Sequence, residues 1–272
     1  MGLVIMTDTL ERSETQVAYE ALAPFYDAFT AGHDYELWTS VIRRLARRHG
    51  LAGTRLLDVG CGTGKSFLPF AAAGWRVTAC DLSPQMLELA AAKAPPQVEL
   101  HLADARELPR LGSFDLVLLL DDVVNHFADA EELTSAFRGA AANLAGDGVL
   151  VFDANLLGAY RTFFAETVIF EDGDTYLAWR GGTAPDSEAG LLAEGRLDAF
   201  TREADGRWRR HDGGHHWQRH FSEPVVRSAL ASAGLECVGV YGHGLDGKPE
   251  TGADELRHTT ALYIARRGAQ AR

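Results

Sequence analysis

The sequence predicts an α/β fold: a seven-stranded, mostly parallel sheet with helices on both faces, an antiparallel last strand and an inserted antiparallel β sub-domain. Three observations support this prediction. Apolar strand patterns alternate with helical patterns between residues 55 and 155, several short strand-like pieces follow, and two strands come last with no helix between them. Alternating strands and helices are typical of an open parallel sheet, whereas consecutive short strands pair antiparallel.

These patterns divide the 272 residues into four parts. Residues 1–50 are expected to be helical after a frayed start, with Pro24 interrupting the first helix and a break near Ala31–His33. Residues 51–160 hold the parallel core, and residues 161–222 hold the insertion. Residues 223–272 complete the core with a helix and the last two strands.

The core elements follow from local signals in chain order. Each strand is a short apolar run closed by Gly, Asp or Asn, which is typical of a strand buried on both faces. The helices end at Gly74, before Pro95 and at Gly146, and Ser83 is a strong N-cap. The expected strands are Arg55–Gly60, Arg76–Asp81, Val98–Asp104, Phe114–Leu120 and Val149–Asn155, and the expected helices are Gly64–Ala73, Ser83–Ala94 and Ala130–Leu144.

The rhythm changes after Asn155. Between about Thr167 and Phe221, short strand-like pieces are separated by Gly and Asp, which predicts an antiparallel insertion. A helix at Glu223–Ala233 then ends before Gly234. The final strands, Leu235–Tyr241 and Thr260–Arg266, are expected to form an antiparallel hairpin at the edge of the sheet.

Composition narrows the classes of partner. The formal net charge of −12 disfavours binding to a phosphate backbone, so we expect no nucleic-acid partner. No apolar run approaches the ~20 residues of a membrane helix, and the start of the sequence lacks the pattern of a signal peptide. The three cysteines show neither disulfide nor CxxC spacing, so a cytoplasmic protein is expected.

The most specific motif is the glycine-rich turn that follows the first strand, from Asp58 to Ser66. A phosphate-binding P-loop would need glycine at position 59, which is Val59. A dinucleotide fingerprint would need glycine at position 65, which is Lys65. The actual spacing, Gly60, Gly62 and Gly64 after an aspartate, resembles motif I of class I S-adenosylmethionine-dependent methyltransferases, whose fold is Rossmann-like.

Three further segments match that resemblance in order. Asp81 ends the second strand, where the family holds both ribose hydroxyls, and Leu82 and Met86 follow in the segment that flanks adenine. Asp104 and Ala105 end the third strand, where the family contacts the adenine amine, and Phe114 begins a segment like motif IV. The resemblance implies S-adenosyl-L-methionine as cofactor, bound by Asp58, Gly60, Gly62, Gly64, Asp81, Leu82, Met86, Asp104, Ala105 and Asp121.

The fourth strand ends in a polar segment where ligands of open parallel sheets bind, beyond the carboxyl ends of the strands. Asp121, Asp122, Asn125 and His126 lie there. An imidazole titrates near neutral pH, so His126 is our candidate for the catalytic base, with helix capping or packing as the alternative. We expect Asp121 to contact the backbone or the cofactor amine instead.

The N-terminal segment Tyr19–Asp27, followed by Asp34–Trp38, resembles the lid of methyltransferases that act on small amines, notably the amino-sugar and lincosamide N-methyltransferases. This resemblance implies that Tyr19, Tyr26 and Trp38 close over the cofactor. Aromatic rings also suit a sulfonium cation. The alternative is an amphipathic helix that packs its aromatic residues into the core.

The insertion carries a cluster of histidines, among them His216 and His220. No carboxylate or cysteine completes a ligand set, so we expect no metal. We predict that the insertion covers the substrate, with Trp179, Arg180, His216 and His220 as candidate wall residues. The alternative is a surface for homo-oligomerisation through an exposed antiparallel edge.

Together these features predict methyl transfer to the amine nitrogen of a small molecule, such as a sugar-like metabolite or a precursor in antibiotic biosynthesis. The alternative is O-methylation of a hydroxyl, for which the glycine turn and the lid would look the same. A protein that binds S-adenosylmethionine without turning it over is a third reading, and a nicotinamide-dependent oxidoreductase is a fourth.

Overall fold

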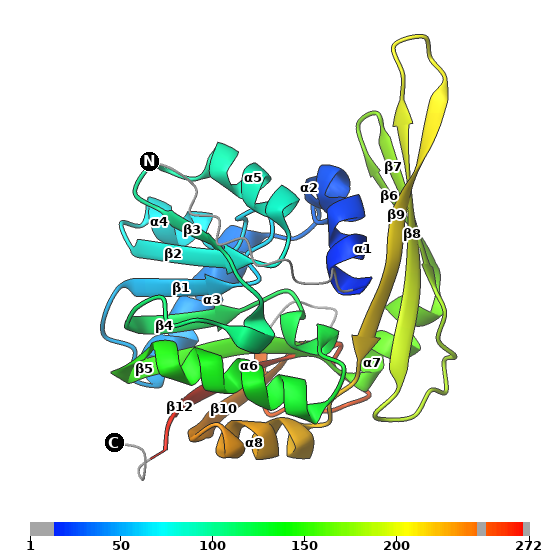
Figure 1. Ribbon diagram of the computed structural model, residues 1–272. Coiled ribbons are helices and arrows are strands. Elements are labelled where there is room, and N and C mark those ends of the chain that lie inside the picture. Colours follow the sequence, from blue (N-terminus) through cyan, green and yellow to red (C-terminus); the bar gives the residue numbers. More distant parts are fainter. Residues whose placement is uncertain (1–13, 244–248, 269–272) are drawn as a thin grey trace.

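The computed structural model describes residues 14–243 and 249–268. Its central feature is an eight-stranded sheet in the order β11-β10-β12-β5-β4-β1-β2-β3 (Figure 1). Strands β1 to β5 pair in parallel, and β12 runs antiparallel to both β5 and β10. The strands are β1 (Arg55–Val59), β2 (Arg76–Asp81), β3 (Glu99–Leu102), β4 (Phe114–Leu119), β5 (Leu144–Asn155), β10 (Leu235–His243), β11 (Pro249–Thr251) and β12 (Thr260–Arg267).

Helices cover both faces of this sheet because its strands alternate side chains between two apolar clusters. In β1, Leu57 packs with α6 and α8, whereas Leu56 packs with α3 and α4. The α-helices are α1 (Glu14–Leu22), α2 (Tyr26–Phe29), α3 (Tyr35–Arg48), α4 (Leu68–Ala72), α5 (Pro84–Lys93), α6 (Ala130–Asn143), α7 (Leu157–Arg161) and α8 (Glu223–Ser232). Short 3-10 turns are η1 (Ala23–Phe25), η2 (Ala105–Glu107), η3 (Val123–His126) and η4 (Phe163–Ala165).

The predicted insertion is a separate four-stranded antiparallel sheet in the order β6-β7-β8-β9. Its strands are β6 (Thr167–Asp172), β7 (Thr175–Gly181), β8 (Leu192–Arg202) and β9 (Trp208–Arg219). Figure 1 shows α1 and α2 standing between this sheet and the core. A third apolar cluster joins α1 and α7 to the insertion sheet, with Leu22 of α1 in the same cluster as Trp179 of β7 and Leu197 of β8.

The predicted fold class is confirmed, with local corrections. The helix expected from Gly64 begins only at Leu68: Gly64 has φ of +91° and cannot be helical, and residues 65–67 form a turn. The strand expected from Val149 starts earlier, at Leu144. The short elements α7 and η4, which link β5 to the insertion, were not expected, and β11 adds an eighth strand at the sheet edge. Among the helices that the structure describes, none is long and apolar enough to cross a membrane.

Candidate functional site

The glycine-rich turn joins β1 to α4 at the carboxyl end of the sheet. Its three glycines all have positive φ, +73° at Gly60, +53° at Gly62 and +91° at Gly64. A Cβ at Gly60 would lie 2.6 Å from Val123, and one at Gly64 would lie 2.7 Å from Phe67. A Cβ at Gly62 would lie no closer than 3.5 Å to Tyr26. A side chain at Gly60 or Gly64 would therefore force Val123 or Phe67 to shift, whereas a Cβ at Gly62 would make only an ordinary van der Waals contact with the Tyr26 ring.

Asp81, at the end of β2, holds this turn in place. One carboxylate oxygen accepts a 2.8 Å hydrogen bond from the amide of Gly62, and the other accepts one of 2.8 Å from the amide of Ser83. Burial raises the pKa of Asp81, and the hydrogen bonds from Ser83 and Gly62 oppose that shift. Each oxygen keeps a lone pair for a further donor, such as a ligand hydroxyl.

A cavity lies beside the glycine turn, and we call it the loop cavity. It is bounded by α1, the turn, and the ends of β2, β3 and β4. Its walls are Thr15, Gln16, Tyr19, Tyr26, Gly60, Gly62, Asp81, Leu82, Ser83, Ala103, Asp104, Ala105, Arg106, Leu120, Asp121, Val123, His126 and Phe127.

Most of the residues expected to bind a cofactor line the loop cavity, but four do not. Gly64 lies in the turn against Phe67, and Met86 is buried on α5. Asp58 lies beneath the turn, where its carboxylate accepts a hydrogen bond from the Ser66 hydroxyl and burial raises its pKa to about 7. Trp38 packs its ring edge-on against His243 at 4.5 Å, away from the cavity.

Asp104 lines the loop cavity, but it already has a strong partner. Arg106 donates to both of its carboxylate oxygens, with Nε at 3.0 Å from each. The same arginine also approaches Glu132 at 3.3 Å. Any hydrogen bond from a ligand amine to Asp104 must share the carboxylate with this guanidinium. No pattern in the sequence indicated that pairing.

A second, larger cavity of about 440 Å³ adjoins the first, and we call it the insertion cavity. The N-terminal helices, the core and the insertion all contribute to it. It is lined by Tyr19, Leu22, Tyr26, Phe29, Thr30, His33, Tyr35, Asp121, Asp122, His126, Asp153, Asn155, Ala159, Thr162, Phe163, Phe164, Trp179, Leu197, His216, Gln218, Thr259 and Thr260.

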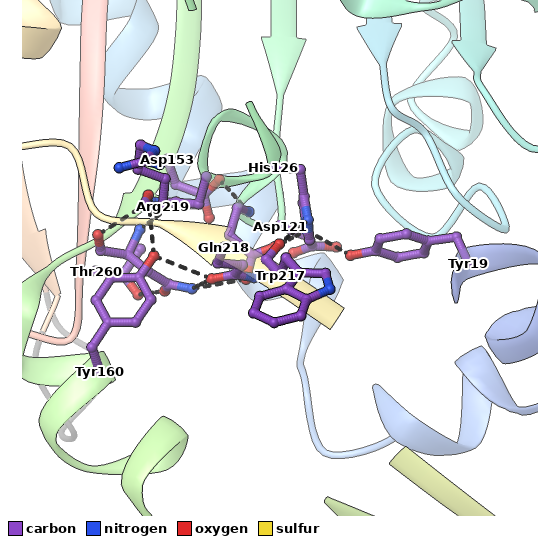
Figure 2. Close-up of polar contacts among 12 residues, drawn as sticks. Tyr19, Asp121, His126, Asp153, Tyr160, Trp217, Gln218, Arg219 and Thr260 are labelled. Carbon is purple, nitrogen blue, oxygen red and sulfur yellow. Dashed lines mark hydrogen bonds and ion pairs between the residues drawn. The ribbon is translucent and has the colours of Figure 1, made fainter. Parts of the chain in front are cut away.

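Four residues line both cavities and mark where they meet: Tyr19, Tyr26, Asp121 and His126. The Tyr19 hydroxyl and Nε2 of His126 are 2.8 Å apart, and Nδ1 of His126 is 3.0 Å from the carbonyl oxygen of Trp217 (Figure 2). That carbonyl can only accept, so Nδ1 donates to it. In the neutral ring, Nε2 then accepts from Tyr19. Burial, reinforced by the charge of Asp122, raises the pKa of Tyr19 well above its ordinary value, which keeps this hydroxyl protonated.

Three carboxylates face the insertion cavity from the ends of β4 and β5. Asp121 and Asp122 both adopt left-handed backbone angles, with φ of +60° and +55°. Asp121 accepts a 2.6 Å hydrogen bond from the Tyr35 hydroxyl, and Asp122 accepts one of 2.8 Å from Asn155. Asp153 accepts from the amide of Asp122 at 3.1 Å, and burial raises the pKa of both Asp121 and Asp153. Non-glycine residues at positive φ often mark functional sites.

Of the four residues of the insertion that were predicted to form the substrate wall, two line the insertion cavity. Trp179 donates its indole N–H to the carbonyl oxygen of Phe163 at 3.1 Å. His216 packs edge-on against Tyr19, with ring centroids 5.5 Å apart. Gln218, the next residue on the same strand face, also lines the cavity, and its Oε1 accepts from Asn155 at 3.0 Å.

The other two predictions are corrected by the structure. Arg180 follows Trp179 in a strand, so its side chain points to the opposite face, where it pairs with Asp198. His220 is buried below the cavity with both ring nitrogens engaged: Nδ1 accepts from the amide of Gly190 at 2.9 Å and Nε2 is 2.9 Å from Glu255. Neither side chain lines the insertion cavity.

Sequence reasoning also left out several residues that the site uses. Asp153 could have been found, because it lies near the end of β5 much as Asp81 ends β2, at the edge where ligands bind. Tyr35 belongs to the N-terminal segment that resembles a lid, although it was not predicted to be a site residue. Phe163, Phe164 and the Trp217 carbonyl carried no local signal, since only the packing of the N-terminal helices and the insertion brings them to the site. Across residues 14–243 and 249–268, no group of three or more His, Cys, Asp or Glu side chains is arranged to hold a metal ion.

Known proteins resemble this chain in sequence. Residues 56–148 match the family of methyltransferase domains. A protein from Geobacillus sp. (strain WCH70), provisionally named a methyltransferase, is 30% identical over 244 residues, covering 88% of this chain and 98% of that protein. The dTDP-3-amino-3,4,6-trideoxy-alpha-D-glucopyranose N,N-dimethyltransferase of Streptomyces venezuelae is 31% identical over 222 residues, covering 78% of this chain and 89% of that enzyme.

Solved structures share the fold. An S-adenosylmethionine-dependent methyltransferase from Clostridium acetobutylicum ATCC 824 matches with a TM-score of 0.76 at 22% identity, covering 92% of this chain and 99% of that one. DesVI from Streptomyces venezuelae matches with a TM-score of 0.72 at 23% identity, covering 90% and 98%. At these identities, the likeness establishes the architecture alone.

Proposed function

The chain belongs to the S-adenosylmethionine-dependent methyltransferases, and from this premise we propose that it methylates the amine nitrogen of a small metabolite. The observation that carries the proposal is the position of His126. It lies where the two cavities meet, with Nε2 directed at Tyr19 and two carboxylates nearby. An amine that enters as its ammonium ion must lose a proton before nitrogen can attack. Nε2 of His126 would accept that proton once the ammonium displaces the Tyr19 hydroxyl from it.

The loop cavity fits the cofactor. Asp81 presents two oxygens that can accept from the ribose hydroxyls, Leu82 and Ala105 offer apolar contact to adenine, and Gly62 leaves room beneath the ligand. S-adenosylmethionine supplies a methyl group already activated by its sulfonium. What remains for the protein is to hold the acceptor nitrogen in line with that methyl group, exclude water and take up the proton.

Asp81→Ala is expected to raise the dissociation constant for S-adenosylmethionine about 10- to 150-fold. This corresponds to the loss of about 1.5–3 kcal/mol of hydrogen bonding to a charged group. Calorimetric titration measures the effect, and Glu88→Ala, an exposed carboxylate on α5, is the matched control. An unchanged dissociation constant would show that Asp81 does not hold the ribose.

The insertion then decides which acceptor is used. Its residues Trp179, His216 and Gln218 face the cavity, while the residues that fit the cofactor lie on the core and lid. We propose that the insertion sets acceptor specificity and that the protein acts in the cytoplasm, where its free Cys61, Cys80 and Cys237 would stay reduced.

Nitrogen methylation is favoured by the cluster of carboxylates around His126, which suits a cationic acceptor. Relatives named as N,N-dimethyltransferases of amino sugars support it. Methylation of a hydroxyl is the alternative, since His126 could equally take a hydroxyl proton, and part of the chain is 38% identical over 82 residues to a magnesium-protoporphyrin O-methyltransferase from Rhodobacter capsulatus.

An acceptor that carries both an amine and a hydroxyl distinguishes methylation at nitrogen from methylation at oxygen. With 2-amino-1-phenylethanol, we expect methylation at nitrogen, located by tandem mass spectrometry of the product. The same compound acts as its own control because both groups enter the same cavity. Methylation at oxygen alone would overturn the proposed function.

A further inference from the structure

The wall of the insertion cavity carries carboxylates but neither lysine nor arginine among the described residues. If the acceptor binds in this cavity, as proposed above, these charges limit which acceptors can bind. Three carboxylates line the cavity: Asp121, Asp122 and Asp153. Arg106, which lines the neighbouring loop cavity, is already paired with Asp104.

The basic groups near the cavity offset these acidic groups only in part. His33 lies in the wall, and His33 and Lys65 act to lower the pKa of Asp121, but burial outweighs them. Burial lowers the pKa of His216 to about 4, so its imidazole is neutral at pH 7.

Nδ1 of His126 donates to the Trp217 carbonyl, and Nε2 lies 2.8 Å from the Tyr19 hydroxyl and 3.5 Å from Asp122. With neither lysine nor arginine among its described wall residues, the cavity favours a cationic ligand. Burial raises the pKa of Asp121 and Asp153, and a bound ammonium would stabilise their charged forms.

The insertion side of the cavity is aromatic. Phe163 stacks on Trp179 with ring centroids 5.0 Å apart and planes at 14°, and Phe29 lies 6.3 Å from Trp179. His216 bridges this group to Tyr19, with centroids 6.0 Å from Trp179 and 5.5 Å from Tyr19. A continuous wall of rings thus runs from the place where the cavities meet to the inner face of the insertion sheet.

We propose that the acceptor is an amine without phosphate groups, which enters as an ammonium ion and carries an apolar or aromatic body. The ammonium would lie against Asp121 and Asp122, and the body against Phe163 and Trp179. This separates the protein from relatives named for dTDP-linked amino sugars. A diphosphate carries negative charge that would have to be buried beside carboxylates without a compensating cation, which is strongly unfavourable.

Binding to the protein saturated with S-adenosylhomocysteine tests this directly by calorimetry. The probes are phenethylamine, its uncharged counterpart 2-phenylethanol, and thymidine diphosphate. Phenethylamine is expected to bind saturably and at least tenfold more tightly than 2-phenylethanol. Thymidine diphosphate is expected not to compete with it.

Two variants test whether the ammonium binds at Asp122 and the apolar body at Trp179. Asp122→Asn keeps the left-handed backbone, which asparagine tolerates, and an oxygen for Asn155, yet removes the charge. It should weaken phenethylamine binding at least tenfold and leave 2-phenylethanol unchanged. Trp179→Leu should weaken both probes severalfold, whereas Trp208→Leu, at an exposed position on β9, should weaken neither.

The outcomes separate this inference from the proposed function. Competition by thymidine diphosphate at equal or higher affinity would overturn the inference, and so would the absence of saturable phenethylamine binding. If a dTDP-linked amino sugar is methylated at nitrogen while phenethylamine neither binds nor reacts, nitrogen methylation stands and the acceptor class is wrong. Methylation of hydroxyls alone would instead remove the proposed function.

Discussion

A valine at position 62 is expected to abolish binding of S-adenosylmethionine while the protein still folds. The first atom of the new side chain would meet nothing closer than the Tyr26 ring at 3.5 Å, so the protein without its cofactor has room for it. Gly62 and Tyr26 both line the loop cavity, and the added methyl groups would occupy the space that the cofactor needs. We expect the dissociation constant for S-adenosylmethionine to rise at least about 100-fold. This corresponds to a loss of about 2.7 kcal/mol or more of binding free energy.

The control for this substitution must reproduce its backbone strain, because φ of +53° is unfavourable for any β-branched residue. Gly74→Val does so: Gly74 has φ of +80°, a Cβ added there would have no neighbouring atom within 4 Å, and the residue lines neither cavity. Both variants should lose a similar amount of thermal stability. Only Gly62→Val should lose the calorimetric signal of cofactor binding, and wild-type affinity in that variant would refute the assignment of the glycine turn.

Removal of the imidazole in His126→Ala is expected to lower turnover by about 10²–10⁴, the usual contribution of a general base. The dissociation constant for S-adenosylmethionine should change little, because the ribose and adenine contacts are proposed to come from other residues. Turnover is measured with saturating acceptor, so that a loss of acceptor binding is not mistaken for a loss of chemistry.

Two further variants make the test of His126 specific. Tyr19→Phe breaks the same 2.8 Å hydrogen bond but leaves the imidazole, so its effect should be at least tenfold smaller. His215→Ala, at an exposed position on β9, should leave turnover unchanged. A loss of only a few fold in His126→Ala would mean that the protein works by orientation and takes neutral amine from solution.

Local patterns in the sequence were enough to predict the core of the fold. Buried parallel strands are continuous apolar runs, and glycines or capping residues such as Ser83 end or begin the elements between them. The glycine turn and Asp81 could be predicted for the same reason, since strand, turn and helix are consecutive in the chain. Both lie in the loop cavity, and the calorimetric titrations of the Gly62 and Asp81 variants test whether each binds the cofactor.

The structure corrects or complicates the predictions that depended on where a side chain points or on which residue it pairs with. Trp179 and Arg180 are predicted on the same wall, but strand alternation sends Arg180 to the other face. Asp104 is predicted to accept from the adenine amine, yet Arg106 folds back onto its carboxylate. His220 is predicted to contact the acceptor and is instead held between Gly190 and Glu255.

The sequence by itself determined the parallel core, the position of the glycine turn and the presence of an antiparallel insertion, because each depends on residues close together in the chain. Only the tertiary structure decided the insertion cavity. Its walls come from α1, the ends of β4 and β5, and the insertion sheet, and His126 is oriented by Tyr19 and Trp217, which are 107 and 91 residues away. Contacts over such separations depend on how whole elements pack, which no local pattern records.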